Sequence, residues 1–290
     1  MLADNQLIAA YFFPYLINSK FHFTLNQYIP IEQDTLWLEC TSQTIPFNHI
    51  GRGTENRPAL MITPDGGVVV NTPVSNPNDN TQFRKTIVSL TSSGTAEVNA
   101  IVTWKGNQQD MIRNIIEDKS PNEIERWVMN SLDIPNLDLK SHLISGMATP
   151  ENGITLTTNC LAKRYGAATG NRLFFHPNMM EKRTYVPPNI DKRLSPIRFY
   201  YPYYDVDTVI YSIPNEFIIE MLPKETMLNS SFGEFVSKTE LNTDGKIVFT
   251  RSLKIEEYEI SADSYPEYKN FFSEIVKADR MQVVLVRKNH

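Results

Sequence analysis

The 290-residue sequence contains only two cysteines, Cys40 and Cys160. Two cysteines cannot form a disulfide framework, and neither has a second thiol or imidazole at the spacing of a zinc site. One bridge between them is chemically possible, but two free thiols in buried or partly buried positions are the expected state. No motif indicates a bound metal or an organic cofactor, so we expect neither.

The sequence also lacks an excess of positive charge and a long hydrophobic run. The 28 lysines and arginines are outnumbered by 33 acidic residues, which gives a net charge of -5, and they are scattered along the chain. This pattern argues against a nucleic-acid surface. No run approaches the roughly 18 apolar residues of a membrane span, so we expect no transmembrane segment. The first residues carry Asp4 and no basic start, which is untypical of a signal peptide.

The sequence does contain the pattern of a folded, strand-rich protein. Hydrophobic residues make up 41% and charged residues 21%, as in globular proteins. Alternating segments separated by turn signals, such as Pro-Asp-Gly-Gly at 64–67, predict many strands. The polar stretch 72–80 marks the expected boundary between a first domain at 1–73 and a second at 74–290, with a possible sub-boundary near 185–196.

Helical signals interrupt the strands of the second domain. Apolar side chains at helical spacing predict helices near 107–118, 120–132 and 264–278. The second of these begins with Ser120, Pro121 and Glu123, the pattern of a capping box with proline at the first helical position. Residues 2–10 also fit the end of a helix.

Several segments resemble one group of multidomain bacterial proteins. The segments that resemble the last strands of their transglutaminase-like core are residues 37–44, 46–47, 56–60 and 63–67. Residues 170–175 and 201–203 resemble the β-rich region that follows this core, and 271–279 resemble its C-terminal domain of unknown function. The resemblance implies a mainly β (α+β) fold, in which an incomplete transglutaminase-like, papain-like α+β remnant is followed by a β-sandwich with helical insertions.

The resemblance also implies where an active site would lie. In that family a nucleophilic cysteine lies on a helix before these strands, and a histidine lies on the strand that precedes the Trp-Leu strand. An acidic residue follows the tryptophan, here Trp37, by two places. Here the cysteine position would lie before Met1, the histidine position falls on Thr24, and only the acidic Glu39 remains. A thiol mechanism needs a thiolate, an imidazole and an orienting group together. We therefore expect no catalytic residue, and treat His22, Thr24 and Glu39 as remnants.

Cys40 and His22 lie close to these remnant residues in the sequence. Cys40 follows Glu39 on a strand, so the two side chains point to opposite faces, which is the wrong geometry for a triad. His22 lies two residues from Thr24 and shares its face in an extended strand, so it could pair with Glu39. The alternative for His22 is an exposed position on an edge strand.

The other polar candidates show no ligand spacing. The dispersed histidines, from which no metal site is expected, are His49, His142, His176 and His290. The segment Asp205-Val206-Asp207 is similar to the start of a calcium loop, but it lacks the glycine and the distant glutamate of an EF-hand. We interpret it as a solvated turn before a strand.

Residues 199–204 form an aromatic run, Phe-Tyr-Tyr-Pro-Tyr-Tyr, in which Pro202 favours an extended backbone. Tyrosine combines a packing face with a polar tip, which suits a binding surface. One interpretation is a stacking platform for a glycan or peptide; its members would be Tyr200, Tyr201, Tyr203 and Tyr204. The other is a strand whose rings alternate between the core and solvent.

By the resemblance, the cysteine-bearing helix that packs on these strands would lie before Met1, which would leave one face of residues 1–40 uncovered. This would expose apolar side chains such as Tyr11, Phe13, Tyr15 and Leu16, whose burial is worth on the order of 1.5–3 kcal/mol each. A contiguous apolar patch marks a contact site. We expect the exposed face of residues 1–40 to bind a second copy of the chain or another protein.

The sequence therefore predicts a non-catalytic structural or binding protein. Its location in the periplasm or cell envelope of a bacterium is implied by the resemblance alone. One alternative is a cysteine-dependent transglutaminase- or protease-like enzyme whose nucleophile lies upstream of Met1. A second alternative is a glycan- or peptide-binding module that uses the aromatic run 199–204.

Overall fold

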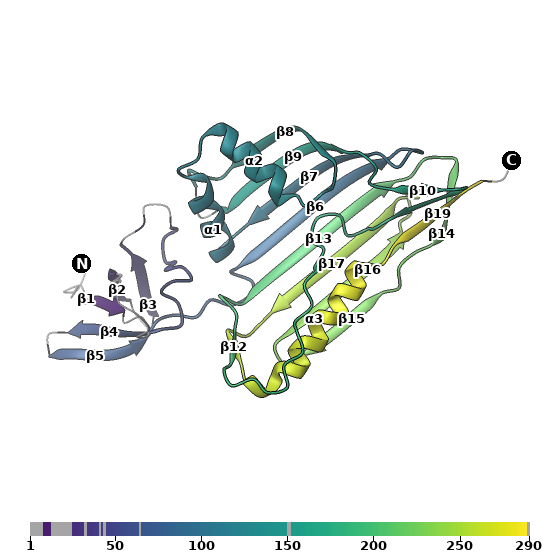
Figure 1. The fold of residues 1–290 in the computed structure, drawn as a ribbon. Coiled ribbons are helices and arrows are strands. Elements are labelled where there is room, and N and C mark those ends of the chain that lie inside the picture. Colours follow the sequence, from purple (N-terminus) through teal and green to yellow (C-terminus); the bar gives the residue numbers. More distant parts are fainter. Residues whose placement is uncertain are drawn as a thin grey trace.

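The fold is mainly β, as predicted, with 43% of the residues in strands and 16% in helices. A computed structural model describes residues 8–12, 25–31, 34–40, 42, 45–63, 65–149 and 152–288. For residues 8–12, 25–31, 34–35 and 63 it describes the backbone alone. Within these ranges the chain forms a large mixed sheet, smaller antiparallel sheets and three α-helices (Figure 1).

The dominant element is an eight-stranded sheet. In spatial order its strands are β15 (Thr226–Ser230), β16 (Gly233–Leu241), β17 (Ile247–Ile255), β13 (Tyr203–Ser212), β6 (Thr81–Leu90), β7 (Ala96–Trp104), β9 (Ile154–Ala162) and β8 (Leu137–Ser145). Strands β13 and β6 pair in parallel, with Val206 opposite Phe83, and the other neighbours are antiparallel. Strands that precede residues 185–196 in the chain and strands that follow them thus belong to one sheet. The predicted domain boundaries stay predictions.

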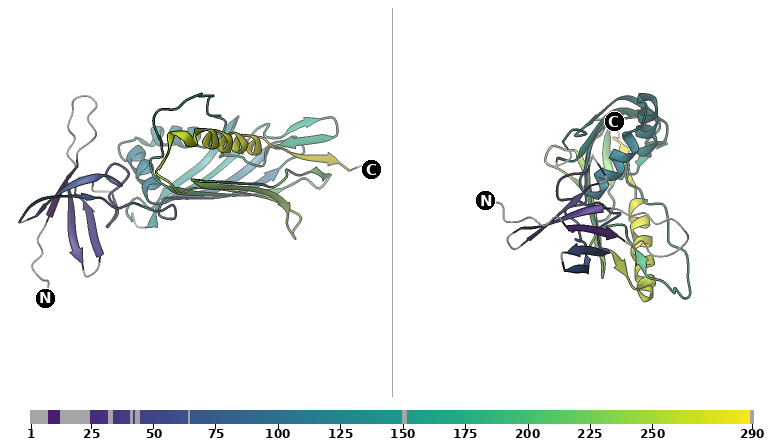
Figure 2. Two further views of the ribbon diagram at one scale, coloured as in Figure 1. Left: turned by 90° about the horizontal axis from the view of Figure 1, so that it is seen from below. Right: turned by 90° about the vertical axis from the view of Figure 1, so that its left-hand side faces the viewer.

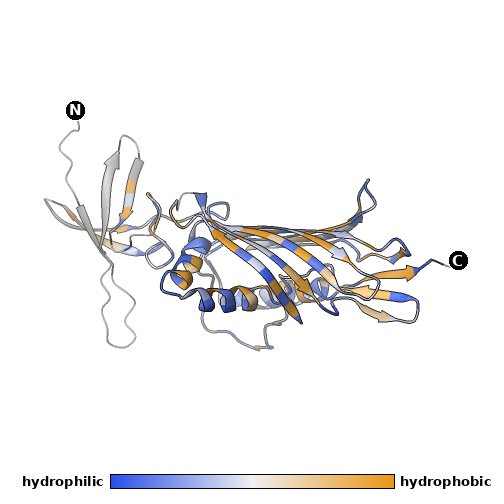
Figure 3. Cartoon of the chain, turned by 90° about the horizontal axis from the view of Figure 1, so that it is seen from above, coloured by the Kyte–Doolittle hydropathy of each residue, from blue (hydrophilic) through white to orange (hydrophobic). Residues whose placement is uncertain are grey.

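Side chains of the long strands alternate between a covered face and an open face. In β6, buried Val88 and Leu90 alternate with Phe83 and Ile87, which are each 46% exposed. Hydrophilic and hydrophobic residues alternate in the same way along the neighbouring strands (Figure 3). Because successive side chains of a strand point to opposite faces, this pattern assigns one face to the core. No helix or strand of the described chain covers the other face (Figure 2).

Helices cover the first of these faces. Helices α1 (Asn107–Ile116) and α2 (Pro121–Ser131) lie near β9 and β8, and α3 (Tyr265–Asp279) lies over the other half of the sheet (Figure 2). All three predicted helices are confirmed, and the capping box is present, since Glu123 accepts a hydrogen bond of 2.9 Å from the Ser120 N–H. No helix in the described ranges is long and apolar enough to span a bilayer.

A four-stranded antiparallel sheet completes the layer above the covered face. Its strands, in spatial order, are β10 (Ala167–Thr169), β11 (Arg172–Phe175), β19 (Val283–Arg287) and β14 (Phe217–Met221). Leu173 and Leu285 of this sheet join one apolar cluster with Val98 of the large sheet and Ile112 of α1. The short strands β12 (Ile197–Arg198) and β18 (Glu259–Ile260) pair separately, and a 3-10 turn, η2 (Ala262–Ser264), precedes α3.

The N-terminal strands form a lobe at one end of the large sheet (Figure 1). Its antiparallel order is β3 (Asp34–Glu39), β2 (Leu25–Ile31), β1 (Ile8–Phe12), β4 (Pro58–Thr63) and β5 (Gly66–Asn71). The predicted helix end at 2–10 is wrong for residues 8–10, because β1 is paired on both sides, with β2 and β4. The expected apolar face, with Tyr11, Phe13, Tyr15 and Leu16, lies outside the described side chains and stays a prediction.

Candidate functional site

The structure describes one of the three remnant residues of the resembled active site. Glu39 ends β3, where it is half-buried and lies opposite Asn26 of β2. His22 and Thr24 lie outside the described residues. The predicted pairing of His22 with Glu39 therefore stays a prediction.

The two thiols are free and lie far from each other in the fold. Cys160 on β9 is only 2% exposed and has Val98 and Leu139 as its neighbours on the adjacent strands. Burial raises the pKa of the Cys160 thiol to about 11, because an apolar environment disfavours the thiolate. Cys40 is exposed, and its Sγ lies 3.6 Å from the Leu38 carbonyl. The expected burial is wrong for Cys40, since β3 ends at Glu39 and leaves it outside the sheet.

One histidine pairs with a carboxylate that its sequence position did not indicate. The His49 Nε2 atom lies 2.6 Å from Oδ2 of Asp110, a residue of α1. Burial lowers the pKa of His49, but the hydrogen bond and charge of Asp110 outweigh it, so the pKa lies above its ordinary value. Among the described residues the Asp110 carboxylate is the side-chain hydrogen-bond partner of the His49 ring.

This His49 pair lies at the junction between the N-terminal lobe and the large sheet. The junction contains a wide, open cavity of about 1020 Å3. Beside it the buried carboxylate of Glu55 accepts hydrogen bonds from Ser75 (2.9 Å), Asn107 (3.1 Å) and the Tyr258 hydroxyl. These contacts join three distant parts of the chain, and they give the junction a structural role.

The other predicted histidines do not converge. His142 lies on β8, the ring of His176 contacts the Met281 carbonyl at 3.3 Å, and His290 lies outside the described residues. Within the described ranges no three histidine, cysteine, aspartate or glutamate side chains gather in an arrangement that would hold a metal ion.

The aromatic run divides between the two faces of the large sheet. Tyr201 and Tyr203 are half-buried, with ring centroids 6.4 Å apart, while Tyr200 is 78% exposed. Tyr204 instead packs edge-on against Phe83 of the open face, with 6.1 Å between the ring centroids. The structure therefore brings Tyr200, Tyr201 and Tyr203 to one place and leaves Tyr204 outside it.

These three tyrosines line a cavity of about 320 Å3 that we call the tyrosine cavity. The remaining lining residues are Gln108, Arg183, Arg198, Phe199, Asp205, Tyr268 and Phe272. They come from α1, from the 176–202 connection, from β13 and from α3. The cavity thus forms where the helical cover meets one end of the sheet.

Asp205 is the carboxyl group of this cavity. Its Oδ1 atom accepts a hydrogen bond of 2.7 Å from Nε2 of Gln108, and its Oδ2 atom makes no hydrogen bond to any described residue. Burial, supported by the charges of Glu181 and Asp207, raises the pKa of Asp205 to about 7, although Gln108 and Arg251 act in the opposite direction. The cavity therefore contains a carboxyl group that titrates near neutral pH.

The interpretation of residues 205–207 as a solvated turn is wrong. Asp205 and Asp207 belong to β13, and Asp207 is 2% exposed. Both point to the covered face because they are two residues apart on a strand. The signal that would have found them is the presence of Arg84 and Arg251 at inward positions of two other alternating strands, since buried charges require partners.

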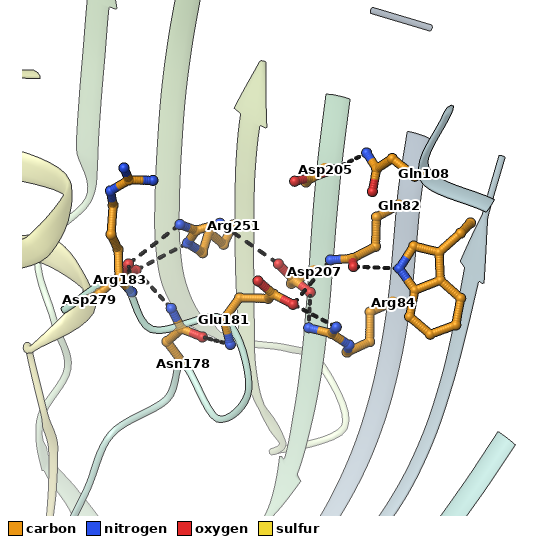
Figure 4. Close-up of polar contacts among 11 residues, drawn as sticks. Gln82, Arg84, Gln108, Asn178, Glu181, Arg183, Asp205, Asp207, Arg251 and Asp279 are labelled. Carbon is orange, nitrogen blue, oxygen red and sulfur yellow. Dashed lines mark hydrogen bonds and ion pairs between the residues drawn. The ribbon is translucent and has the colours of Figure 1, made fainter. Parts of the chain in front are cut away.

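Asp207 belongs to a buried charged network on the covered face (Figure 4). Arg84 contacts Oδ1 of Asp207 at 3.0 Å and Oε1 of Glu181 at 2.6 Å. Arg251 contacts Oδ1 of Asp279, at the end of α3, at 3.0 Å. Two buried arginines thus face three carboxylates, so the network has an excess of negative charge before Asp205 is counted.

The carboxylates of this network are not equivalent. The pKa of Asp207 rises to about 6, chiefly because of burial. Burial also acts to raise the pKa of Glu181, but the charge and hydrogen bond of Arg84 outweigh it and leave the pKa below its ordinary value. The negative charges of Glu181 and Asp207 would therefore favour the binding of a cationic group near Asp205.

Arg183 is the unpaired cation of the tyrosine cavity. Its guanidinium carbon lies 3.9 Å from the centre of the Phe272 ring, and its Nε is buried without a hydrogen-bond partner. No carboxylate of the described chain forms an ion pair with it. Arg198, by contrast, is held by Glu259 at 2.5 Å. The cavity therefore combines the Arg183 guanidinium group, which has no ion-pair partner among the described residues, with the Asp205 carboxyl group, of whose two oxygens one accepts a hydrogen bond.

Comparison with known proteins assigns part of the chain. A family model described as a "Domain of Unknown Function with solved-structure structure (DUF3858)" matches residues 171–285. Residues 171–285 are thus similar to this domain, and the predicted resemblance of the C-terminal part to a domain of unknown function is confirmed. The matched part includes Arg183, Asp205 and residues 199–204, whereas Gln108 lies before it.

A solved structure is also similar to this chain. It is the crystal structure of a "putative protease" from Parabacteroides distasonis ATCC 8503, with a TM-score of 0.42 and 11% sequence identity over 97% of this chain. The present chain spans 40% of the length of that protein. No curated protein sequence matches the chain. The transglutaminase-like character of residues 1–73 stays a prediction.

Proposed function

We propose that the chain is a non-catalytic recognition module whose ligand binds in the tyrosine cavity. The observation that supports this most is that Tyr200, Tyr201 and Tyr203 line a cavity of about 320 Å3 together with a polar group, Asp205. Cavities of roughly 300–1,000 Å3 with aromatic walls and a few convergent polar groups are typical of small-molecule sites. By the resemblance set out above, we place this module in the periplasm or cell envelope of a bacterium.

The surroundings of the thiols support the non-catalytic part of the proposal. A nucleophilic cysteine needs a lowered pKa, which a neighbouring imidazolium or a helix N-terminus supplies. Burial has the opposite effect on Cys160. Cys40 lies in an exposed bend and contacts a backbone carbonyl. The alternative, a cysteine-dependent enzyme whose nucleophile lies upstream of Met1, would use Glu39 as its acidic residue.

Thiol labelling tests this part of the proposal. At pH 8 we expect Ellman's reagent to modify one thiol per native chain, Cys40, at the rate of an unactivated thiol. Cys160 should react only after unfolding, because its side chain is buried and its pKa is raised. The Cys40→Ser variant should show no reaction in the native state. Rapid modification of either cysteine at pH 6 would indicate an activated thiolate and contradict the proposal.

Ligand-detected NMR tests the binding site. The probes are alanyl-alanine, N-acetylglucosamine and chitobiose, because the aromatic run fits a peptide or a glycan. We expect at least one probe to bind. Tyr201→Ala should raise its dissociation constant about two- to tenfold, since one ring contact contributes roughly 0.5–1.5 kcal/mol.

Tyr204→Ala is the matched control for this experiment. It removes a neighbouring ring of the same type from the open face, where Tyr204 contacts Phe83, and should leave binding unchanged. Binding of no probe, or equal effects of the two substitutions, would refute the tyrosine cavity as the binding site.

A further inference from the structure

We propose that the tyrosine cavity binds a small zwitterion, of the size of an amino acid or dipeptide, through an ammonium group at Asp205 and a carboxylate at Arg183. This inference rests on the function proposed above and adds the chemical class of the ligand. It depends on two groups of opposite charge that line the same cavity and lack full compensation by the protein.

The ammonium end is assigned from the contacts of Asp205. Gln108 occupies Oδ1 at 2.7 Å, and Oδ2 has no partner among the described residues. The nearby network adds an excess of negative charge from Glu181 and Asp207. An ammonium group donates up to three hydrogen bonds and carries the opposite charge, so it satisfies Oδ2 and the local field together.

The carboxylate end is assigned from Arg183. Figure 4 shows Arg183 beside Asp279 at the upper left of the charged network, and Asp205 above Asp207 at its upper right. The ring of Phe272, 3.9 Å from the guanidinium carbon, holds the Arg183 side chain in place. Because a guanidinium group presents its donors as a planar fork, it fits a carboxylate with two parallel hydrogen bonds.

The walls between the two ends favour a short zwitterion over a glycan. The lining residues that supply aromatic rings are Phe199, Tyr200, Tyr201, Tyr203, Tyr268 and Phe272. A sugar presents hydroxyl groups along its whole length and needs several polar partners, but Arg198 is already paired with Glu259. A ligand with charged ends and an apolar middle matches a cavity whose lining combines aromatic rings with two groups of opposite charge.

Isothermal titration with three matched probes tests the inference. The probes are alanyl-alanine, N-acetyl-alanyl-alanine, which lacks the cation, and alanyl-alanine amide, which lacks the anion. We expect each blocked probe to bind at least about tenfold more weakly than the parent dipeptide, the loss typical of one charge-assisted hydrogen bond. Equal binding of the parent and either blocked form would overturn the inference.

Two substitutions assign the ends of the ligand. Asp205→Asn keeps the acceptor for Gln108 but removes the charge, so N-acetylation should no longer weaken binding to this variant. Arg183→Met retains an unbranched side chain against Phe272, and amidation should no longer weaken binding to it. Thermal unfolding of both variants confirms that they are folded. If the blocked probes still lose affinity to the same extent, the assigned contacts are wrong.

The pH dependence provides an independent readout. Because the pKa of Asp205 is about 7, ionisation of its carboxyl group should strengthen dipeptide binding as the pH rises from 6 to 7.5. Above about pH 8 binding should weaken again, since the α-amino group of the probe loses its proton. The titratable, charged and hydrogen-bonding groups around Asp205 are Gln108 of α1, Glu181 of the 176–202 connection, Arg84 of β6, Arg251 of β17, and Tyr201, Tyr203 and Asp207. In Asp205→Asn the rising limb should disappear, and a rising limb that persists would contradict the inference.

The glycan probes separate the proposed binding function of the cavity from the proposed zwitterionic class of its ligand. If N-acetylglucosamine or chitobiose binds in a Tyr201-dependent manner and alanyl-alanine does not, the binding function stands and the zwitterion inference is wrong. If no probe binds, the proposed function fails as well.

Discussion

Replacement of Asp279 by alanine should lower the free energy of unfolding by about 3–5 kcal/mol, the cost of breaking a buried ion pair from one side. Asp279 is 2% exposed and accepts hydrogen bonds from Arg251 (3.0 Å) and Asn178 (2.7 Å), and its Oδ2 accepts one from the Arg183 backbone N–H (2.9 Å). Its removal leaves the buried Arg251 without its closest carboxylate. Urea denaturation followed by circular dichroism measures the loss.

Glu274→Ala is the matched control, because it removes a carboxylate from the same helix. Glu274 pairs with Lys277 at 2.6 Å at the exposed surface of α3. Such exposed pairs contribute roughly 0–1 kcal/mol, so the control should be nearly neutral. Similar losses for the two variants would show that the buried network does not stabilise the fold. Asp279→Ala should also weaken dipeptide binding, since it releases the segment that positions Arg183.

Gly106→Ala should destabilise the protein by more than about 3 kcal/mol, because two separate costs combine. Gly106 precedes α1 with φ 58° and ψ -140°, a backbone conformation that is accessible almost only to glycine. A Cβ atom there would lie 2.2 Å from the Asp79 carbonyl oxygen and 2.5 Å from Oδ1 of Asn80. The backbone oxygen cannot move aside without displacing the strand that follows it. The midpoint of urea unfolding measures the effect.

Gly245→Ala separates the two costs of the preceding substitution. Gly245 also has a positive φ, 73°, but a Cβ atom there meets nothing within 4 Å. Its replacement should cost only the roughly 1–2 kcal/mol of the left-handed conformation. If Gly106→Ala were no more harmful than Gly245→Ala, the close approach at Asp79 would not exist in solution. Gly106→Ala should also disturb the contact of Gln108 with Asp205, because α1 begins at the next residue.

Local patterns in the chain predicted the regular elements well. The alternation in β6 and the capping box at Ser120 and Glu123 identified a strand and a helix, because each depends on neighbours only two to four residues apart. The same reasoning failed at residues 8–10, where pairing with two other strands outweighs the helical spacing. Strand pairing over long distances leaves no local signature.

The candidate site was only partly predictable. Its aromatic wall was recognised from residues 199–204, because ring-rich segments are visible in the sequence. Tyr204 was grouped with the others, although strand alternation directs it to the opposite face, toward Phe83. The interpretation of residues 205–207 as a solvated turn fails at Asp205, since nothing near it in the chain indicates its partner Gln108, 97 positions away.

The local patterns of the sequence were enough to predict a mainly β protein with three helices. With only two cysteines, the sequence also predicted no disulfide framework. Which polar groups meet depended on the tertiary fold alone, because the parallel pairing of β6 with β13 joins segments that are distant in the sequence. That pairing brings Arg84 beside Asp207, 123 residues away, and together with α1 and α3 it places Asp205 and Arg183 around one cavity. Buried charges persist only where such distant partners compensate them.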